Sequence, residues 1–370
     1  MALARKPVCI NDFEVFAKEK LTKSQYEYLR GGTEDEVSLN ENINAFRRLC
    51  IRPRYLRDVS NIELATTLLG APVSCPIGLA PSAHHCLVDP ADGEIGAARA
   101  ACTAGMCFTQ SSFSNKSVLE VAAAVPTGLK WFQLYVMRDE QVTMGLIRLA
   151  ESAGFKALVV TCDVPVLSRR RTDVIWPLVL PSHLCCGNFD AIQSASSSTS
   201  READTSRFFS NVLIHPALTW TMLERLAAST KLPIVLKGVM SADDARLAVK
   251  HGVSAVWVSN HGARHFDSLC PTIDVLPEIV AAIGHQVEVY VDSGFRTGTD
   301  ILKGLALGAR AVFIGRPVQW GLAYGGSSGL TELLDLLRVE LELAMGLSGC
   351  ASARDFEPGL VFRRSCCSRL

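Results

Sequence analysis

Residues 259–264 (SNHGAR) contain the side chains of this chain best suited to catalysis. They follow the apolar run 255–258, so His261 and Arg264 lie in a glycine-containing turn after a predicted strand. An imidazole is the side chain most easily set to accept a proton near neutral pH. A guanidinium group is planar and can hold a carboxylate through two parallel hydrogen bonds. Together the two residues predict a proton acceptor beside an anion clamp, and thus an enzyme acting on a small acidic molecule.

Two later apolar runs are followed by a glycine close to an arginine. Residues 292–296 (DSGFR) follow one of them, and Gly315 and Arg316 follow the other. Backbone N–H groups of such a turn and a nearby cation can hold one phosphate together. The two turns therefore predict a site for a phosphorylated cofactor.

The composition excludes several classes of partner. The 37 basic residues balance the 37 acidic ones, so no overall charge favours nucleic acid or an anionic membrane surface. No apolar run is long enough to cross a bilayer, and residues 1–7 lack the apolar core of a secretory signal. The 13 cysteines include no paired C-x-x-C motif, which favours reduced thiols. We expect a soluble intracellular protein that binds neither nucleic acid nor membrane.

Eight short apolar runs with helical patterns between them predict repeated strand–helix units. Their nearly continuous apolar composition is typical of parallel strands that are covered on both faces. Eight such units in one chain favour a closed (β/α)₈ barrel. The alternative is an open doubly wound sheet, but the chain has neither a G-x-G-x-x-G opening its first unit nor a G-x-x-x-x-G-K-[ST] motif. The runs are 75–80, 106–111, 131–136, 157–161, 234–237, 255–259, 287–291 and 312–315.

Segments outside the regular repeat complete the predicted fold. The long interval between the fourth and fifth runs includes a serine-rich tract at 194–200, which predicts a mobile cover over the active-site face. Asn11 and Glu14 resemble a capping box at the start of a first helix, and a second helix over 24–30 should stop at Gly31 and Gly32. A packed helix over 331–345 should close the barrel. We expect one domain over 1–370, with N-terminal helices over about 10–60, the barrel over about 70–345 and a tail over 346–370.

In a barrel the site lies at the carboxyl-terminal ends of the strands. Hydroxyl, amide, lysine and backbone groups at these ends suit the edge of a flavin, whereas a metal would need clustered His and carboxylate ligands, and none is expected. Lys237 is costly at the end of an apolar strand unless it meets an anion. Asp163 could cap a helix or accept a hydrogen bond from His261, and His261 on its own would more often be a packed core residue. The paired His84 and His85 indicate loop packing rather than a ligand site.

Several of these segments together resemble one known family. They are 131–135 (WFQLY), 259–264 with Asp267, and 304–309 (GLALGA) leading to 315–317 (GRP). On these motifs the chain is similar, nearly end to end, to the FMN-dependent 2-hydroxy acid oxidases, the glycolate oxidase family. Within that family the chain is most similar to the peroxisomal long-chain branch. The shared features are residues 85–88, residues 52–60 and Phe113, which stands where glycolate enzymes have Trp.

The resemblance implies a role for each candidate residue. His261 would be the active-site base, oriented by Asp163, and Tyr135 would hydrogen-bond the substrate hydroxyl. Arg170 and Arg264 would hold the substrate carboxylate, aided by Tyr28. Lys237 would offset the negative charge of reduced flavin. The residues implied to bind FMN are Pro81, Ser82, Ala83, Ser111, Gln133, Thr161, Lys237, Ser259, Asp292, Ser293, Gly294, Phe295, Arg296, Gly315 and Arg316.

The resemblance also implies a reaction, a location and an assembly. A medium- or long-chain 2-hydroxy acid would be oxidised to the 2-oxo acid while O₂ is reduced to H₂O₂. The terminal Ser368-Arg369-Leu370 resembles the tripeptide that the peroxisomal import receptor binds, and homotetramers are the habit of the family. The alternatives are a short-chain glycolate-type oxidase, a flavin dehydrogenase with another electron acceptor, and a catalytically silent relative.

Ser293 departs from the family pattern, because it stands where the second glycine of Asp-Gly-Gly is usual. If this position has positive φ, the serine strains the turn by about 1 kcal/mol.

Overall fold

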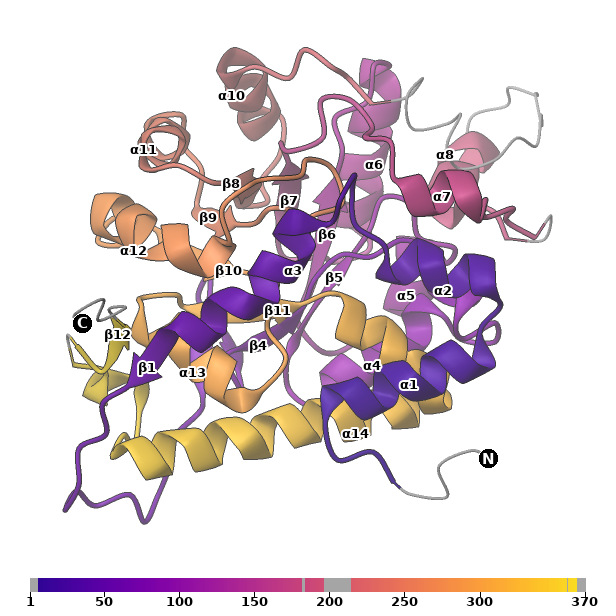
Figure 1. The fold of residues 1–370 in the computed structure, drawn as a ribbon. Helices are drawn as coiled ribbons and strands as arrows, with labels where there is room; N and C mark the ends of the chain where they lie inside the picture. The colour runs from indigo at the N-terminus through magenta and orange to yellow at the C-terminus, as the bar shows by residue number, and fades with distance from the viewer. Residues whose placement is uncertain (1–5, 182–183, 196–213, 358, 365–370) are drawn as a thin grey trace.

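Eight parallel strands close into a barrel in the computed structural model of the chain, which describes residues 6–181, 184–195, 214–357 and 359–364 (Figure 1). Around the barrel the strands follow the order β10-β11-β4-β5-β6-β7-β8-β9, and β9 pairs with β10 to close it. Each strand overlaps one of the eight predicted runs, so the closed barrel is confirmed and the open sheet was the wrong alternative. The strands are β4 (Ile77–Leu79), β5 (Cys107–Gln110), β6 (Lys130–Leu134), β7 (Leu158–Thr161), β8 (Ile234–Val239), β9 (Ala255–Val258), β10 (Glu288–Val291) and β11 (Ala311–Ile314).

Helices follow the strands in sequence and surround the barrel (Figure 1). The described part of the long interval between β7 and β8 holds three helices, whereas residues 182–183 and 196–213 lie outside the described residues. The serine-rich tract at 194–200, which led to the prediction of a mobile cover, falls largely on that undescribed part. The surrounding helices are α4 (Glu94–Thr103), α5 (Val118–Ala124), α6 (Glu140–Ser152), α7 (Arg171–Ile175), α8 (Gly187–Ala195), α10 (Trp220–Ala228), α11 (Ala242–Lys250), α12 (Thr272–Ile283), α13 (Gly298–Ala306) and α14 (Arg316–Ser348), with a short 3₁₀ turn, η2 (His85–Leu87), before α4.

Aromatic rings fill the interior of the barrel. Trp131, Trp257, Tyr290 and Phe313 are completely buried there, and the ring centroids of Trp257 and Phe313 lie 3.9 Å apart. Gly78 on β4 makes room for this packing, because a Cβ atom at that position would collide with the Phe313 ring. The barrel is therefore a packed core rather than a pore.

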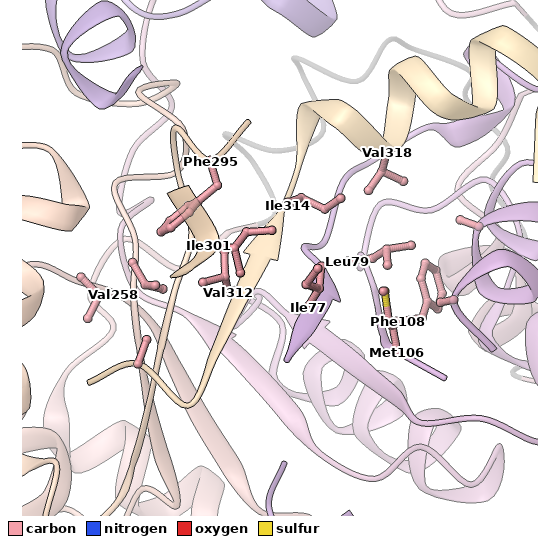
Figure 2. Close-up of a cluster of buried hydrophobic side chains, with 14 of the residues drawn as sticks. Ile77, Leu79, Met106, Phe108, Val258, Phe295, Ile301, Val312, Ile314 and Val318 are labelled. Atoms are coloured by element: carbon pink, nitrogen blue, oxygen red, sulfur yellow. The ribbon is translucent and has the colours of Figure 1, made fainter. Parts of the chain in front are cut away.

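The alternation of side chains along each strand builds a second core outside the barrel. Val312 and Ile314 flank Phe313 on β11 and belong to the outer cluster, together with Ile77 and Leu79 of β4 and Val318 of α14 (Figure 2). Because both faces of each strand are buried, the apolar composition of these runs was nearly continuous.

A hairpin closes the amino-terminal end of the barrel. It consists of β2 (Thr66–Leu68) and β3 (Ala71–Val73), whose Leu68 and Val73 join the inner aromatic cluster. Nearby in sequence, β1 (Leu49–Ile51) pairs with β12 (Val361–Arg363) and joins the segment before the barrel to the segment after it; η3 (Ala353–Asp355) precedes β12. A ligand site is therefore left to the opposite, carboxyl-terminal end.

From residue 6 onward, where the structure describes the chain, the N-terminal region has three α-helices, not two. They are α1 (Ile10–Lys20), α2 (Lys23–Arg30) and α3 (Val37–Asn44), followed by the turn η1 (Ala45–Arg48). The predicted capping box at Asn11 is wrong, since Asn11 lies inside α1 and Cys9 precedes the helix without a side-chain cap. A capping box does start α2, between Thr22 and Gln25, and α2 ends at Arg30 as predicted.

The predicted closing helix is the second part of α14. Its φ and ψ angles are non-helical at Gly325 and Gly326, so two helices meet at a kink there. The first part begins directly after β11, while the second buries Leu333, Leu337 and Leu341. Within the described ranges, no helix combines the length and the apolar composition needed to cross a bilayer.

Candidate active site

A cavity of about 240 Å³ opens at the carboxyl-terminal end of the barrel, and the ends of all eight barrel strands contribute to its wall. Residues Tyr28 and Leu29 of α2 cover part of it. Two predicted site residues, Asp163 and Ser259, lie just behind the wall. The predicted residues that line the cavity are Tyr28, Pro81, Ser82, Ala83, Ser111, Gln133, Tyr135, Thr161, Arg170, Lys237, His261, Arg264, Asp292, Ser293, Gly294, Phe295, Arg296, Gly315 and Arg316.

His261 and Asp163 form a hydrogen-bonded pair, with Nδ1 of the imidazole 3.0 Å from Oδ1 of the carboxylate. Burial lowers the pKa of His261 below its usual value, and the charge of Asp163 opposes that effect. Burial raises the pKa of Asp163, but the His261 imidazole and the Lys237 ammonium outweigh it and lower this pKa to about 2. Asp163 is therefore ionised at neutral pH and accepts from Nδ1–H, which leaves Nε2 of a neutral His261 free to accept a proton.

The backbone around His261 has an uncommon conformation. Both His261 (φ 55°) and Ala263 (φ 60°) lie in the left-handed region, which costs a non-glycine residue about 1 kcal/mol or more. The N–H of His261 donates to Oγ of Ser259 at 3.1 Å, which helps to hold this conformation. Such strain often accompanies functional positions, where the surrounding structure fixes it.

Lys237 is almost completely buried, and it lies close to an anion, the carboxylate of Asp292, as expected for a lysine at the end of an apolar strand. Its Nζ lies 3.6 Å from Oδ2 of Asp292 and donates to Oγ of Ser259 at 3.0 Å. Asp292 also accepts from the indole N–H of Trp257 at 3.0 Å. These contacts fix one ammonium charge at the cavity wall.

Two arginines lie close to the ring of Tyr28. The guanidinium carbon atoms of Arg170 and Arg264 lie 5.1 Å and 5.2 Å from the ring centroid. Arg170 lines the cavity, whereas its neighbours Arg169 and Arg171 are exposed. Of the three consecutive arginines, Arg170 is therefore the one that lines the cavity.

Each of these arginines also has a partner that fixes its orientation. Arg170 donates from Nε to Oδ2 of Asp173 at 2.7 Å. Arg264 donates to the backbone carbonyl oxygens of Tyr28 and Gly31 at 2.9 Å and 3.1 Å. Because these carbonyls lie at the carboxyl-terminal end of α2, Arg264 anchors that helix over the cavity.

The opposite end of the cavity carries the two predicted phosphate turns. The Arg296 side chain donates to the carbonyl of Phe295 at 2.9 Å, and among the described residues no carboxylate lies within ion-pair distance of it. The Arg316 guanidinium donates to backbone carbonyls, including those of Gly31 and Gly262, both at 2.9 Å. Burial lowers the pKa of both arginines. The N-terminus of α14 adds the positive end of a helix dipole. Partly buried cations that have no carboxylate partner among the described residues fit the phosphate of a cofactor such as FMN.

Ser293 has φ 77°, so the positive φ that would strain a serine is present. Its Oγ donates to Oδ1 of Asp292 at 2.7 Å and accepts from the N–H of Gly262 at 3.1 Å. The serine therefore exchanges backbone strain for two hydrogen bonds between the β9 and β10 loops.

This exchange predicts different effects for two substitutions. Ser293→Ala keeps the strain and loses both hydrogen bonds, so it should lower the free energy of unfolding by about 1–2 kcal/mol. Ser293→Gly relieves the strain as well and should stay within about 1 kcal/mol of the wild type. Urea denaturation of the two variants checks the order. An alanine variant at least as stable as the glycine variant would contradict this account.

Several cavity residues were not predicted from sequence as site residues. His265 packs its ring edge-on against His261, with centroids 4.3 Å apart, and burial lowers its pKa well below the usual value. The sequence could have identified His265 as a site residue, because it directly follows Arg264. It could not have identified Gln319, which lies within a helix. Among the described residues, no cluster of three or more His, Cys, Asp or Glu side chains could hold a metal ion. The unpredicted lining residues include Leu29, His84, Leu167, Ile214, Gly262, His265 and Gln319.

A positive cavity with a His–carboxylate pair, at the carboxyl end of a closed barrel, is the kind of site that barrel flavoenzymes use. The family model for FMN-dependent dehydrogenase matches residues 17–363, and the chain belongs to that family. FMN is accordingly its cofactor, in agreement with the phosphate-type turns described above.

Similar proteins match nearly the whole chain. Human 2-hydroxyacid oxidase 2 is 44% identical over 96% of this chain and 98% of its own length. Glycolate oxidase of Spinacia oleracea is 45% identical over 94% of this chain and 93% of its own length. The crystal structure of mandelate oxidase superposes with a TM-score of 0.86 and 40% identity, over 95% of this chain and 97% of that one.

Proposed function

We propose that this chain is an FMN-dependent (S)-2-hydroxy acid oxidase that forms a 2-oxo acid and reduces O₂ to H₂O₂. The observation that carries the proposal is that the His261–Asp163 pair shares one cavity with Arg170 and Arg264, and that the turns at its other end suit the phosphate of FMN. The names of the relatives, hydroxyacid oxidase, glycolate oxidase and mandelate oxidase, support the same class of substrate.

Arg170 and Arg264 bind the substrate carboxylate and thereby fix the carbon that is oxidised. Tyr28, whose ring lies close to both guanidinium groups, orients them. Burial raises the pKa of Tyr135 far above its usual value, so its hydroxyl stays protonated and donates to the substrate hydroxyl. Holding the substrate in this way converts a bimolecular step into a positioned one.

His261 accepts a proton from the substrate at Nε2, because Asp163 occupies Nδ1–H. FMN, when bound, takes up the two electrons that the substrate loses. Lys237 holds a positive charge at the cavity wall that favours this transfer, since negative charge develops in a poorly hydrated site.

The proposed cofactor contacts divide along the cavity. We assign the isoalloxazine ring of FMN to the loops after β4 to β7 and to Lys237. Gln133 helps to order this end of the cavity by donating from Nε2 to Oγ1 of Thr161 at 3.0 Å. Ser259 supports Lys237 from behind. The ribityl and phosphate end is assigned to Asp292, Ser293, Gly294, Phe295, Arg296, Gly315 and Arg316, which line the other side.

The purified full chain tests the proposal directly. We expect a flavin absorption spectrum, bleaching by 2-hydroxyoctanoate or glycolate, and H₂O₂ formation in air. Bleaching without H₂O₂ in air would replace the oxidase by a dehydrogenase with another acceptor. A colourless chain that takes up no FMN would instead favour a catalytically silent relative.

We further propose medium- or long-chain aliphatic substrates, because Phe113, Leu167 and Ile214 line the cavity with apolar surface. Phe113 packs against Tyr135 and Phe189, with centroids 5.6 Å and 5.5 Å away. Phe113→Trp should narrow this wall and lower kcat/KM for 2-hydroxyoctanoate relative to glycolate by about tenfold. Steady-state kinetics with both substrates measures this ratio, and a ratio that stays constant or rises would contradict the assignment.

Three further properties remain proposals. We propose one domain over residues 1–370 that assembles as a homo-oligomer, in line with the family habit of tetramers. A peroxisomal location through the import receptor rests on Ser368-Arg369-Leu370, which lie outside the described residues. It is compatible with a reaction that releases H₂O₂.

A further inference from the structure

His84 lies on the wall of the cavity, directly after Ala83 on the loop that follows β4. The sequence indicated loop packing for it, and it is indeed only 2% exposed. Its backbone is left-handed, with φ 59° and ψ 49°, a conformation that costs a non-glycine residue about 1 kcal/mol or more. Strain of this kind is a reason to look for a function.

The side chain of Asn115 determines which ring nitrogen of His84 carries the hydrogen. Oδ1 of Asn115 accepts from the backbone N–H of Cys86 at 3.1 Å, and Nδ2 donates to the backbone carbonyl of Cys185 at 3.0 Å. Because both partners are backbone groups with fixed roles, the amide has one orientation. Nδ2 also lies 3.4 Å from Nδ1 of His84, so Nδ1 is the acceptor and the hydrogen is on Nε2.

His84 is also neutral at physiological pH. Burial lowers its pKa to about 4, although the charge of Glu94 acts in the opposite direction. The carboxylate of Glu94 is already engaged by the backbone N–H groups of His85, Asn115 and Lys116. Among the described residues, Nε2 of His84 has no hydrogen-bond partner. The atom keeps some accessible surface, and its residue lines the cavity. The wall thus carries a neutral donor of defined tautomer that has no acceptor among the residues the structure describes.

We propose that Nε2–H of His84 donates a hydrogen bond to the ring end of bound FMN, with Asn115 fixing the tautomer. The ring end is favoured because His84 shares its loop with Ser82 and Ala83. The two arginines assigned to the phosphate, Arg296 and Arg316, lie instead on the loops after β10 and β11. The isoalloxazine ring offers carbonyl and nitrogen acceptors, and a neutral donor binds them without adding charge. This inference rests on the cofactor placement proposed above.

Two substitutions in the full chain, freed of flavin, test the contact. His84→Phe keeps a ring of similar size and removes the donor, whereas His84→Gln restores an N–H donor. Titration with FMN and with riboflavin, followed by flavin fluorescence, gives the dissociation constants. Replacement of the exposed His285 by Phe, at the other end of the barrel, is the matched control.

We expect His84→Phe to weaken FMN and riboflavin by the same factor, about tenfold, and to shift the absorption maximum of the bound flavin. His84→Gln should recover most of the affinity, and the control should bind as the wild type does. Unchanged binding in His84→Phe, equal losses in both variants, or a loss confined to FMN would each overturn the proposal. If the wild-type chain binds FMN but oxidises no 2-hydroxy acid, the proposed activity is wrong. The same titration still tests the His84 contact, because it measures flavin binding and not turnover.

Discussion

The His261→Gln variant should bind FMN as tightly as the wild type and reduce it about 10²–10⁴-fold more slowly. Glutamine can keep a hydrogen bond to Asp163, which lies 3.0 Å from the imidazole, but its amide cannot accept a proton at neutral pH. The loss therefore falls on the chemical step rather than on cofactor binding. Anaerobic mixing of the variant with 2-hydroxyoctanoate, followed by flavin absorbance, measures this step.

His251 provides a matched control for that variant. It also forms a His–carboxylate pair, with Nδ1 2.6 Å from Glu224, but it lies on the helical surface away from the cavity. His251→Gln should leave the rate of flavin reduction within about twofold of the wild type. If His261→Gln were also reduced at close to the wild-type rate, His261 would not be the base.

The barrel was predictable because each strand is buried on both faces, which leaves an unbroken apolar run in the sequence. The third N-terminal helix was not, because distant residues stabilise it. The N–H groups of Val37 and Ser38 at the start of α3 donate to the carboxylate of Asp267, at 3.2 Å and 2.8 Å. A local pattern does not contain such a cap, and it also misplaced the capping box at Asn11, where the residue types fit but the backbone is already helical.

Most residues of the cavity wall were also predictable from the positions of the strands. Since the carboxyl ends of parallel strands meet at one end of a barrel, residues at strand ends such as Lys237 and His261 were placed together from sequence. The role inferred for His84 was not predictable, because its tautomer depends on Asn115, which another loop supplies. The choice of Arg170 among three arginines likewise needed the structure.

Asp163→Asn should slow flavin reduction at neutral pH by about 10²–10⁴-fold while leaving FMN bound. The carboxylate now accepts from Nδ1–H of His261, which keeps Nε2 free to take the proton. An asparagine amide can donate to Nδ1 instead, which favours the tautomer with its hydrogen on Nε2. In that tautomer the atom that faces the substrate can no longer act as the base.

The same variant should also change the pH dependence of kcat/KM in a defined direction. His261 must be neutral to accept a proton, so activity is lost as pH falls through its pKa, which burial already holds below 6.5. The negative charge of Asp163 raises that pKa against burial, so its removal lowers the pKa further. The acid limb of the profile should therefore move to lower pH although the maximal rate falls. Steady-state rates between about pH 4 and 8 measure both effects. An acid limb that moved to higher pH would show that Asp163 acts on a group other than His261.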